Sequence, residues 1–203
     1  MSQFIYGVNY LLLEAYPIVF TVGHNMNNLV SGLMFIPIPI GGIAACLFYI
    51  FHIHPKYQAT MRVHHPNLPP PEHHIEPGAY GAILLPISFF WFAWTSYPNI
   101  SYWAPMMAGF PLGMGIVLLY LGLFSYIIDV YFTYTASALA AAVMVRSIFG
   151  AVFPLFANQM FEKLNPRWAG TLLGVVSLLM APIPFVLYRY GPALRAKSRA
   201  NRQ

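Results

Sequence analysis

The sequence predicts an all-α membrane protein, built as a bundle of about six transmembrane helices. Of its 203 residues, 59% are hydrophobic and only 7% are charged, whereas soluble domains carry about 25% charged residues. The mean hydropathy is +0.62. Six apolar stretches are long enough to cross the hydrocarbon core of a bilayer, which takes roughly 20 residues. Lipid rather than water is therefore the main solvent of this chain.

The six expected spans follow one another along most of the sequence. They cover residues 4–22, 30–51, 79–97, 103–127, 136–156 and 168–187. Residues 1–190 would then form a single six-helix bundle with a long connection at residues 52–78, and residues 191–203 a basic tail. The short connections between other spans predict that consecutive helices are antiparallel neighbours. The first apolar run lacks a basic segment and a cleavage site, so we expect it to be retained.

The connection at residues 52–78 is rich in histidine and proline. Proline lacks a backbone N–H and disfavours helix interiors, so we expect this segment to be semi-extended. Its histidines form three close pairs, which are His52 with His54, His64 with His65, and His73 with His74. A membrane di-iron site needs histidines three or four residues apart. The spacing therefore disfavours a metalloenzyme and favours a solvated loop or adventitious metal binding, and no cofactor is expected.

The basic residues predict how the bundle is oriented. Half of the ten Lys and Arg residues lie in the last fifteen positions: Arg189, Arg195, Lys197, Arg199 and Arg202. Lys56 and Arg62 would share their side of the membrane, whereas only Lys163 and Arg167 would lie on the other. The positive-inside rule then places the C-terminus in the cytoplasm. The formal net charge of +5 reflects the basic residues of this tail, and it does not indicate a nucleic-acid-binding groove.

Two ionisable residues lie near the middle of expected spans, where a charge is costly and marks a functional candidate. One is Glu14, which shares a helical face with Gly7, Tyr10, Pro17 and Thr21. We expect this face to point inward, with Glu14 handling substrate or protons; the alternative is a hydrogen bond that locks helix packing. Pro17 is expected to kink the helix beside the carboxylate.

The other mid-span charge is Arg146, which follows an alanine-rich run at residues 136–142 that favours close helix approach. Arginine stays charged and must find a carboxylate, carbonyl groups or water. A packing or gating contact is favoured over direct substrate contact. Asp129 closes the cytoplasmic end of the fourth span as a second structural or gating charge. That span also carries four glycines expected to allow close packing: Gly109, Gly113, Gly115 and Gly122.

Several segments resemble parts of one known protein family. Residues 134–156, YTASALAAAVMVRSIFGAVFPLF, closely resemble the eleventh helix of the fungal drug:proton antiporters of the major facilitator superfamily, which have twelve helices. Residues 14–20, EAYPIVF, resemble the seventh helix of this family, and residues 86–96, PISFFWFAWTS, its ninth. Pro71, Glu72 and Pro77 resemble its loop between helices eight and nine, and residues 182–191 the end of its twelfth helix. The resemblance covers essentially the whole chain, in order.

The resemblance implies the C-terminal half of a proton-coupled exporter of small organic compounds, such as drugs, polyamines or similar cations. It implies that the first and fourth spans line the central cavity, which would place Tyr10 and Glu14 at the substrate path, with Tyr6 as a further candidate for binding substrate or protons. Expected partners are the lipid bilayer, protons, the substrate and either an N-terminal six-helix half or a second copy of this chain; nucleic acid is not expected. The expected location is the plasma membrane, with the vacuolar membrane as the alternative.

The sequence also departs from the family pattern. Ala142 and Val143 stand where Asn and Thr are usual, Ser125 stands where Asn is common, and His74 replaces a usual Arg. Counterparts of the family's first six helices are absent from the 203 residues, although the translocation path of this superfamily runs between its two halves. A homodimeric half-transporter and a non-transporting truncated fragment or regulatory partner therefore remain alternatives.

Overall fold

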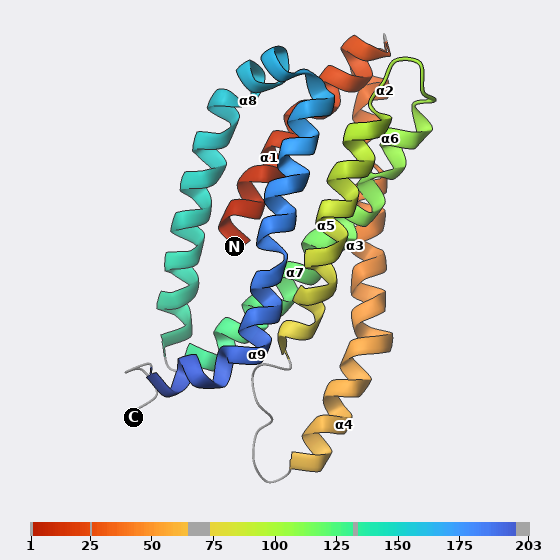
Figure 1. The fold of residues 1–203 in the computed structure, drawn as a ribbon. Helices are drawn as coiled ribbons and strands as arrows, with labels where there is room; N and C mark the ends of the chain where they lie inside the picture. The colour runs from red at the N-terminus through yellow and green to blue at the C-terminus, as the bar shows by residue number, and fades with distance from the viewer. Residues whose placement is uncertain (1, 25, 65–73, 132–133, 198–203) are drawn as a thin grey trace.

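The computed structural model describes residues 2–24, 26–64, 74–131 and 134–197, and these contain helices and turns but no strand. The elements are α1 (Ser2–Pro17), a π-helical turn (Ile18–Gly23), α2 (Asn28–Leu33), α3 (Pro37–Phe48), a second π-helical turn (Tyr49–Ile53), α4 (His54–His64), α5 (Glu76–Thr95), α6 (Trp103–Met107), α7 (Gly109–Tyr131), α8 (Thr135–Met180) and α9 (Pro182–Lys197). They form one bundle of long, roughly aligned helices (Figure 1). The expected all-α fold class is confirmed.

Within the described residues, five helical stretches are long and apolar enough to cross a membrane. They are Asn28–Thr60, Glu76–Thr95, Trp103–Val130, Thr135–Phe153 and Leu164–Tyr190. The first expected span, residues 4–22, is helical in α1 and the following π-helical turn, but it is not among the five.

The α8 helix consists of two limbs joined by a bend, so it supplies two of the five stretches. Asn165 has φ 61° and ψ 152° at this bend. A positive φ is uncommon outside glycine, although asparagine tolerates it better than most residues. Pro166 follows directly and restricts Asn165 to an extended ψ. The first limb runs the length of the bundle, and the second returns beside it (Figure 1).

The helix order in space differs from the expectation that consecutive spans are neighbours. The main neighbour of α3 is α7, not α5, and α7 in turn packs against α5. Glycines make both contacts possible: a Cβ on Gly41 would lie 2.1 Å from the carbonyl oxygen of Phe110, and one on Gly113 would lie 1.9 Å from that of Ile38. The predicted close packing of the fourth span is therefore confirmed, and it brings the second and fourth spans together.

An aromatic cluster forms the centre of the core. The ring of Tyr16 stacks on Phe35 at a centroid distance of 4.5 Å and on Phe92 at 5.1 Å. Because these residues come from α1, from the connection before α3 and from α5, the cluster ties the first three expected spans together. Tyr16, Phe20 and Phe92 have almost no exposed surface.

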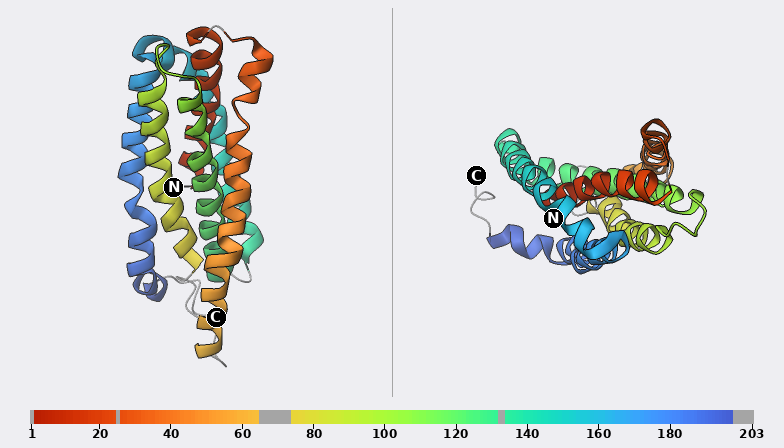
Figure 2. Two further views of the ribbon diagram at one scale, coloured as in Figure 1. Left: turned by 90° about the vertical axis from the view of Figure 1, so that its right-hand side faces the viewer. Right: turned by 90° about the horizontal axis from the view of Figure 1, so that it is seen from above.

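The expectation of a semi-extended segment throughout residues 52–78 is wrong for its described parts. His54–His64 form α4, which continues α3 through a π-helical turn and projects beyond the bundle (Figures 1 and 2). The π-helical turn ends two residues before Pro55, which lies in the first turn of α4, where a missing N–H is tolerated. Pro77 lies in the first turn of α5, where a proline is tolerated. The prolines at positions 66 and 69–71 lie outside the described residues.

The exposed side chains along α3 are apolar, which suits contact with lipid. Exposed isoleucines and a leucine recur along α3 at helical spacing: Ile36, Ile40, Ile43 and Leu47. In cross-section the bundle is elongated, with the first limb of α8 near one end and the segment from α2 to α3 near the other (Figure 2). The first limb of α8 contributes no buried residue over Thr135–Phe153.

Candidate functional site

Arg146 lies at the centre of a cluster of tyrosines where α1, α7 and α8 meet. Its guanidinium carbon is 4.8 Å from the centroid of the Tyr6 ring, which is a cation–π geometry. The guanidinium also donates a hydrogen bond to the Tyr120 hydroxyl. Both partners are only partly buried. A carboxylate, carbonyl groups or water were the expected partners of Arg146; the described contacts are instead with tyrosine side chains.

Tyr6 and Tyr10 extend the cluster along α1. Their hydroxyl oxygens are 3.0 Å apart, so one hydroxyl donates to the other, and their rings meet edge to face at 4.9 Å. Gly150 lies one helical turn after Arg146, and a Cβ there would approach Tyr6 to 3.0 Å. The absence of a side chain at this position therefore makes room for the tyrosines beside the guanidinium.

Glu14 lies one turn beyond Tyr10, and its exposure contradicts the expectation that its face points inward. The opposite face of α1 is buried instead, through Val8, Leu12 and Ala15, while Glu14 is exposed. No described residue forms a hydrogen bond or an ion pair with the carboxylate. Within this chain, Glu14 therefore does not lock helix packing, because the core of the bundle lies on the other side of α1.

The other residues of the expected polar face of α1 do not share one environment. Pro17 is exposed on the Glu14 side, and the π-helical turn begins directly after it, which fits the predicted distortion. Gly7 is buried, because it accommodates the ring of Phe153 in α8: a Cβ there would come within 2.4 Å. The hydroxyl oxygen of Thr21 is buried without a described partner. The periodicity thus identified the helix but did not predict which of its faces is buried.

Asp129 lies at the end of α7, apart from the tyrosine cluster. Its carboxylate forms a short ion pair with Nδ1 of His74, and the ring of Tyr57 in α4 lies 4.3 Å from the His74 ring. Lys56 and Glu76 make a second ion pair nearby, at 3.5 Å. Asp129 therefore connects α7 to the segments that flank the long connection. His74 provides this pairing although it replaces the arginine usual in the family.

Two observations bear on the histidines. Among the described residues, no three His, Cys, Asp or Glu side chains converge as a metal site would require. His24 instead joins two parts of the fold: Nδ1 is 3.0 Å from the carbonyl oxygen of Val19, and Nε2 is 3.1 Å from that of Ile100. A neutral imidazole has one N–H, so both bonds form together only in the protonated ring.

The tyrosine cluster was only partly predictable. Tyr6, Tyr10 and Arg146 were candidates, and the structure brings them together; Tyr120 was missed. The available signal was a pair of tyrosines, Tyr120 and Tyr126, in the fourth span. The partnership of Tyr120 with Arg146 depends on how α7 approaches α8, which residue spacing does not reveal.

Replacing Arg146 with glutamine is expected to destabilise the bundle. The substitution removes the cation–π contact with Tyr6 and the charged hydrogen bond to Tyr120, which together contribute about 2 kcal/mol. Tyr6→Phe is the matched control, because it keeps the ring face under the guanidinium and loses only the hydroxyl bond to Tyr10. Thermal unfolding of the purified chain in detergent measures both. Equal melting temperatures for wild type and Arg146→Gln would show that these contacts contribute nothing.

These features define a polytopic helical membrane protein with a polar, partly exposed cluster on one side of its bundle. Comparison with known proteins identifies its relatives. The chain is 40% identical over 193 residues to a major facilitator superfamily multidrug transporter of Aspergillus fumigatus, covering 95% of this chain and 32% of that protein. It is 43% identical over 201 residues to a citrinin biosynthesis cluster transporter of the same superfamily in Monascus ruber, covering 96% and 39%. An efflux pump of Fusarium oxysporum is 36% identical over 193 residues, covering 95% and 32%.

The chain is therefore a relative of the fungal major facilitator superfamily transporters and corresponds to one half of such a protein. It spans about a third of the length of the relatives that it matches. No family model matches the chain, and no solved structure matches it either. Its relatives are transporters rather than enzymes, and it is an integral, multi-pass membrane protein.

Proposed function

We propose that this chain forms one wall of the substrate path in a proton-coupled exporter of small organic compounds. The observation that carries the proposal is the unpartnered polar face of the bundle. Tyr10 is partly exposed and Glu14 is exposed, on an α1 helix whose other face is buried. A carboxylate in contact with lipid is costly. A facing bundle that encloses water and substrate removes that cost, and in this superfamily the substrate lies between two such halves.

The first limb of α8 supports the same arrangement. It has no buried residue over Thr135–Phe153, although its run of alanines is suited to close helix contact. Within this chain it contacts α1, where Gly150 adjoins Tyr6 and Phe153 adjoins Gly7. The first limb of α8, which holds Arg146, thus offers another bundle a second exposed surface. This surface lies beside the exposed face of α1 that holds Glu14.

The nature of the substrate follows from the groups on this face. Glu14 offers a carboxylate to a cation or a proton, and the tyrosines offer ring faces and hydroxyls to an aromatic or cationic compound. The names of the relatives, which include a multidrug transporter and an efflux pump, support export of organic compounds. Proton coupling rests on Glu14, the one acidic residue on the exposed face of α1.

Glu14→Gln is expected to abolish proton coupling or cation recognition without impairing folding. Glutamine keeps the shape and hydrogen-bonding capacity of the side chain but carries no charge. Transport would be measured after co-expression with an N-terminal six-helix half from a related transporter, across a range of external pH. Glu76→Gln is the matched control, since it removes a carboxylate at the end of the bundle near the long connection. Undiminished, equally pH-dependent transport by Glu14→Gln would remove this residue from the mechanism.

The orientation that we propose places the long connection and the C-terminal tail together in the cytoplasm. The ends of α4 and α9 leave the bundle on the same side, which supports a common location (Figure 1). Tags placed after His64 and after Arg199 should therefore show equal protease accessibility in sealed vesicles. Opposite accessibility would mean an odd number of crossings between them and would refute the orientation.

A further inference from the structure

Arg167 lies directly after the bend of α8, enclosed by aromatic rings from two helical segments. Its guanidinium carbon is 4.2 Å from the ring centroid of Trp94, 5.5 Å from that of Tyr97 and 5.4 Å from that of Trp168. Tryptophan and tyrosine gather where a membrane meets water. This residue therefore holds its charge at an end of the bundle, within an aromatic box that can also contact lipid headgroups.

The hydrogen-bonding capacity of Arg167 is not used up by the protein. Its Nε–H is buried and has no partner, and the guanidinium forms no ion pair with any side chain that the structure describes. A buried donor on a charged group is costly when it lacks an acceptor. Arginine also presents its N–H groups as a fork that fits the oxygens of a phosphate or carboxylate. The missing partner is thus an anion.

A cavity of about 520 Å³ adjoins this side chain. It is lined by Ile18 and Val22 from the π-helical turn after α1, by Ser96 and Tyr97 after α5, and by Arg167 at the start of the second limb of α8. Its walls therefore combine one cation with apolar side chains and a hydroxyl. That combination suits the polar head of an amphiphile better than a bare ion.

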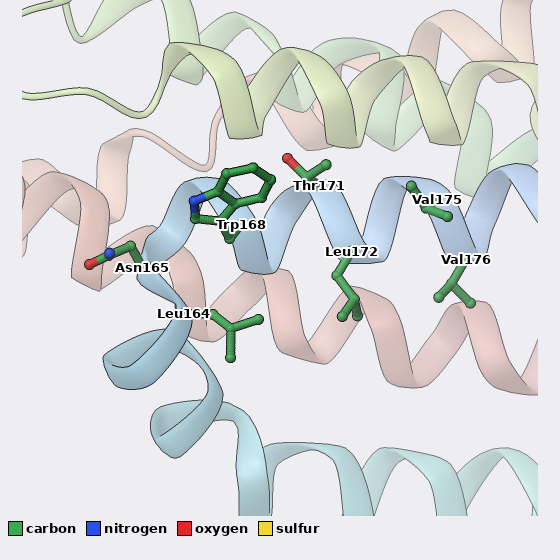
Figure 3. A pocket seen from close by; sticks show the side chains of 7 residues that line it. All are labelled: Leu164, Asn165, Trp168, Thr171, Leu172, Val175 and Val176. Atoms are coloured by element: carbon green, nitrogen blue, oxygen red, sulfur yellow. The ribbon is translucent and has the colours of Figure 1, made fainter.

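An apolar groove of about 600 Å³ continues from the same place. It shares Asn165 and Trp168 with the cavity, and Leu164, Leu172 and Val176 line it along successive turns of the second limb (Figure 3). Leu172 is 45% exposed. Further along the limb, Leu178 and Leu179 are also exposed to the surroundings of the bundle. The groove is therefore lined by exposed apolar side chains and provides room for an acyl chain.

We propose that Arg167, held among the rings of Trp94, Tyr97 and Trp168, binds the phosphate group of an anionic phospholipid, whose acyl chain occupies the adjoining groove. A phospholipid accounts for all three features: its phosphate supplies the acceptor that Nε lacks, its glycerol region fits the cavity, and its chain fits the groove. A soluble organic anion would leave the lateral groove empty. The site is separate from the Tyr6, Tyr10 and Arg146 cluster and does not depend on the proposed transport function.

Tryptophan fluorescence of the purified chain in detergent micelles tests this site. Phospholipids with brominated acyl chains would be added at low mole fraction, comparing phosphatidic acid with phosphatidylcholine. We expect phosphatidic acid to quench at a concentration about tenfold lower, because a charged hydrogen-bonded pair contributes on that scale. Trp168→Phe should lower the amplitude of quenching, since this ring borders the groove.

Two variants locate the charge requirement. Arg167→Gln should abolish the preference for phosphatidic acid, whereas Arg62→Gln, which removes an exposed charge in α4, should retain it. Equal quenching of the wild-type chain by the two lipids would overturn the proposal, and this comparison needs no variant to fold. A preference that survives in Arg167→Gln would also overturn it. So would binding of soluble benzoate at Arg167 without any lipid preference, because the occupant would then be a solute.

Discussion

Gly41→Ala is expected to disrupt the contact between α3 and α7 and to destabilise the bundle strongly. The added Cβ would lie 2.1 Å from the carbonyl oxygen of Phe110 and 3.0 Å from the backbone nitrogen of Met114. Both atoms belong to the backbone of α7, so no side-chain rotation relieves the clash, and the two helices must move apart. Overpacking of this kind costs about 3 kcal/mol, which corresponds to a fall in melting temperature of about 10 °C for a chain of this size.

The adjacent glycine provides the matched control. A Cβ on Gly42 would come no closer than 3.4 Å to Val117, through a side-chain methyl group. Gly42→Ala should therefore change the melting temperature by no more than a few degrees, although it makes the same chemical change in the same helix. Thermal unfolding of the two purified variants in detergent distinguishes them. Equal destabilisation by both would mean that helix flexibility, and not the approach of α7, explains the glycines of α3.

This contact also shows where sequence reasoning succeeds and where it stops. The apolar runs predicted a helical membrane bundle, because each span must satisfy its own backbone hydrogen bonds in lipid. The glycines of the fourth span predicted close packing. They did not predict that α7 packs against α3. The contact between Gly113 and Ile38 joins residues that are far apart in the sequence, and it depends on how the two helices cross.

The candidate site illustrates the same limit. The cost of a charge in a membrane singled out Glu14 and Arg146. Only the arrangement of α1, α7 and α8 brought Arg146 to Tyr6 and Tyr120, and only the buried face of α1 left Glu14 exposed. The helix at residues 54–64 was missed because the expected semi-extended segment rested on prolines at positions 66–77, which lie beyond the end of this helix.

Reconstituted alone, these 203 residues are expected to insert into a membrane but not to transport. Transport in this superfamily requires two bundles that rock about a substrate held between them, so that each side of the membrane gains access in turn. This chain offers one wall of such a path. Glu14 and the exposed limb of α8 would face lipid, which favours self-association of the chain.

The most direct test of the proposed function is therefore the flux of a cationic dye into proteoliposomes under an imposed pH gradient. The orientation and the oligomeric state of the protein would be checked in the same preparation. With this chain alone, we expect flux no greater than in empty liposomes; with an N-terminal six-helix half from a related transporter, we expect flux that follows the pH gradient. Strong pH-driven flux with this chain alone would contradict the account, and it would make a homodimeric half-transporter the better description.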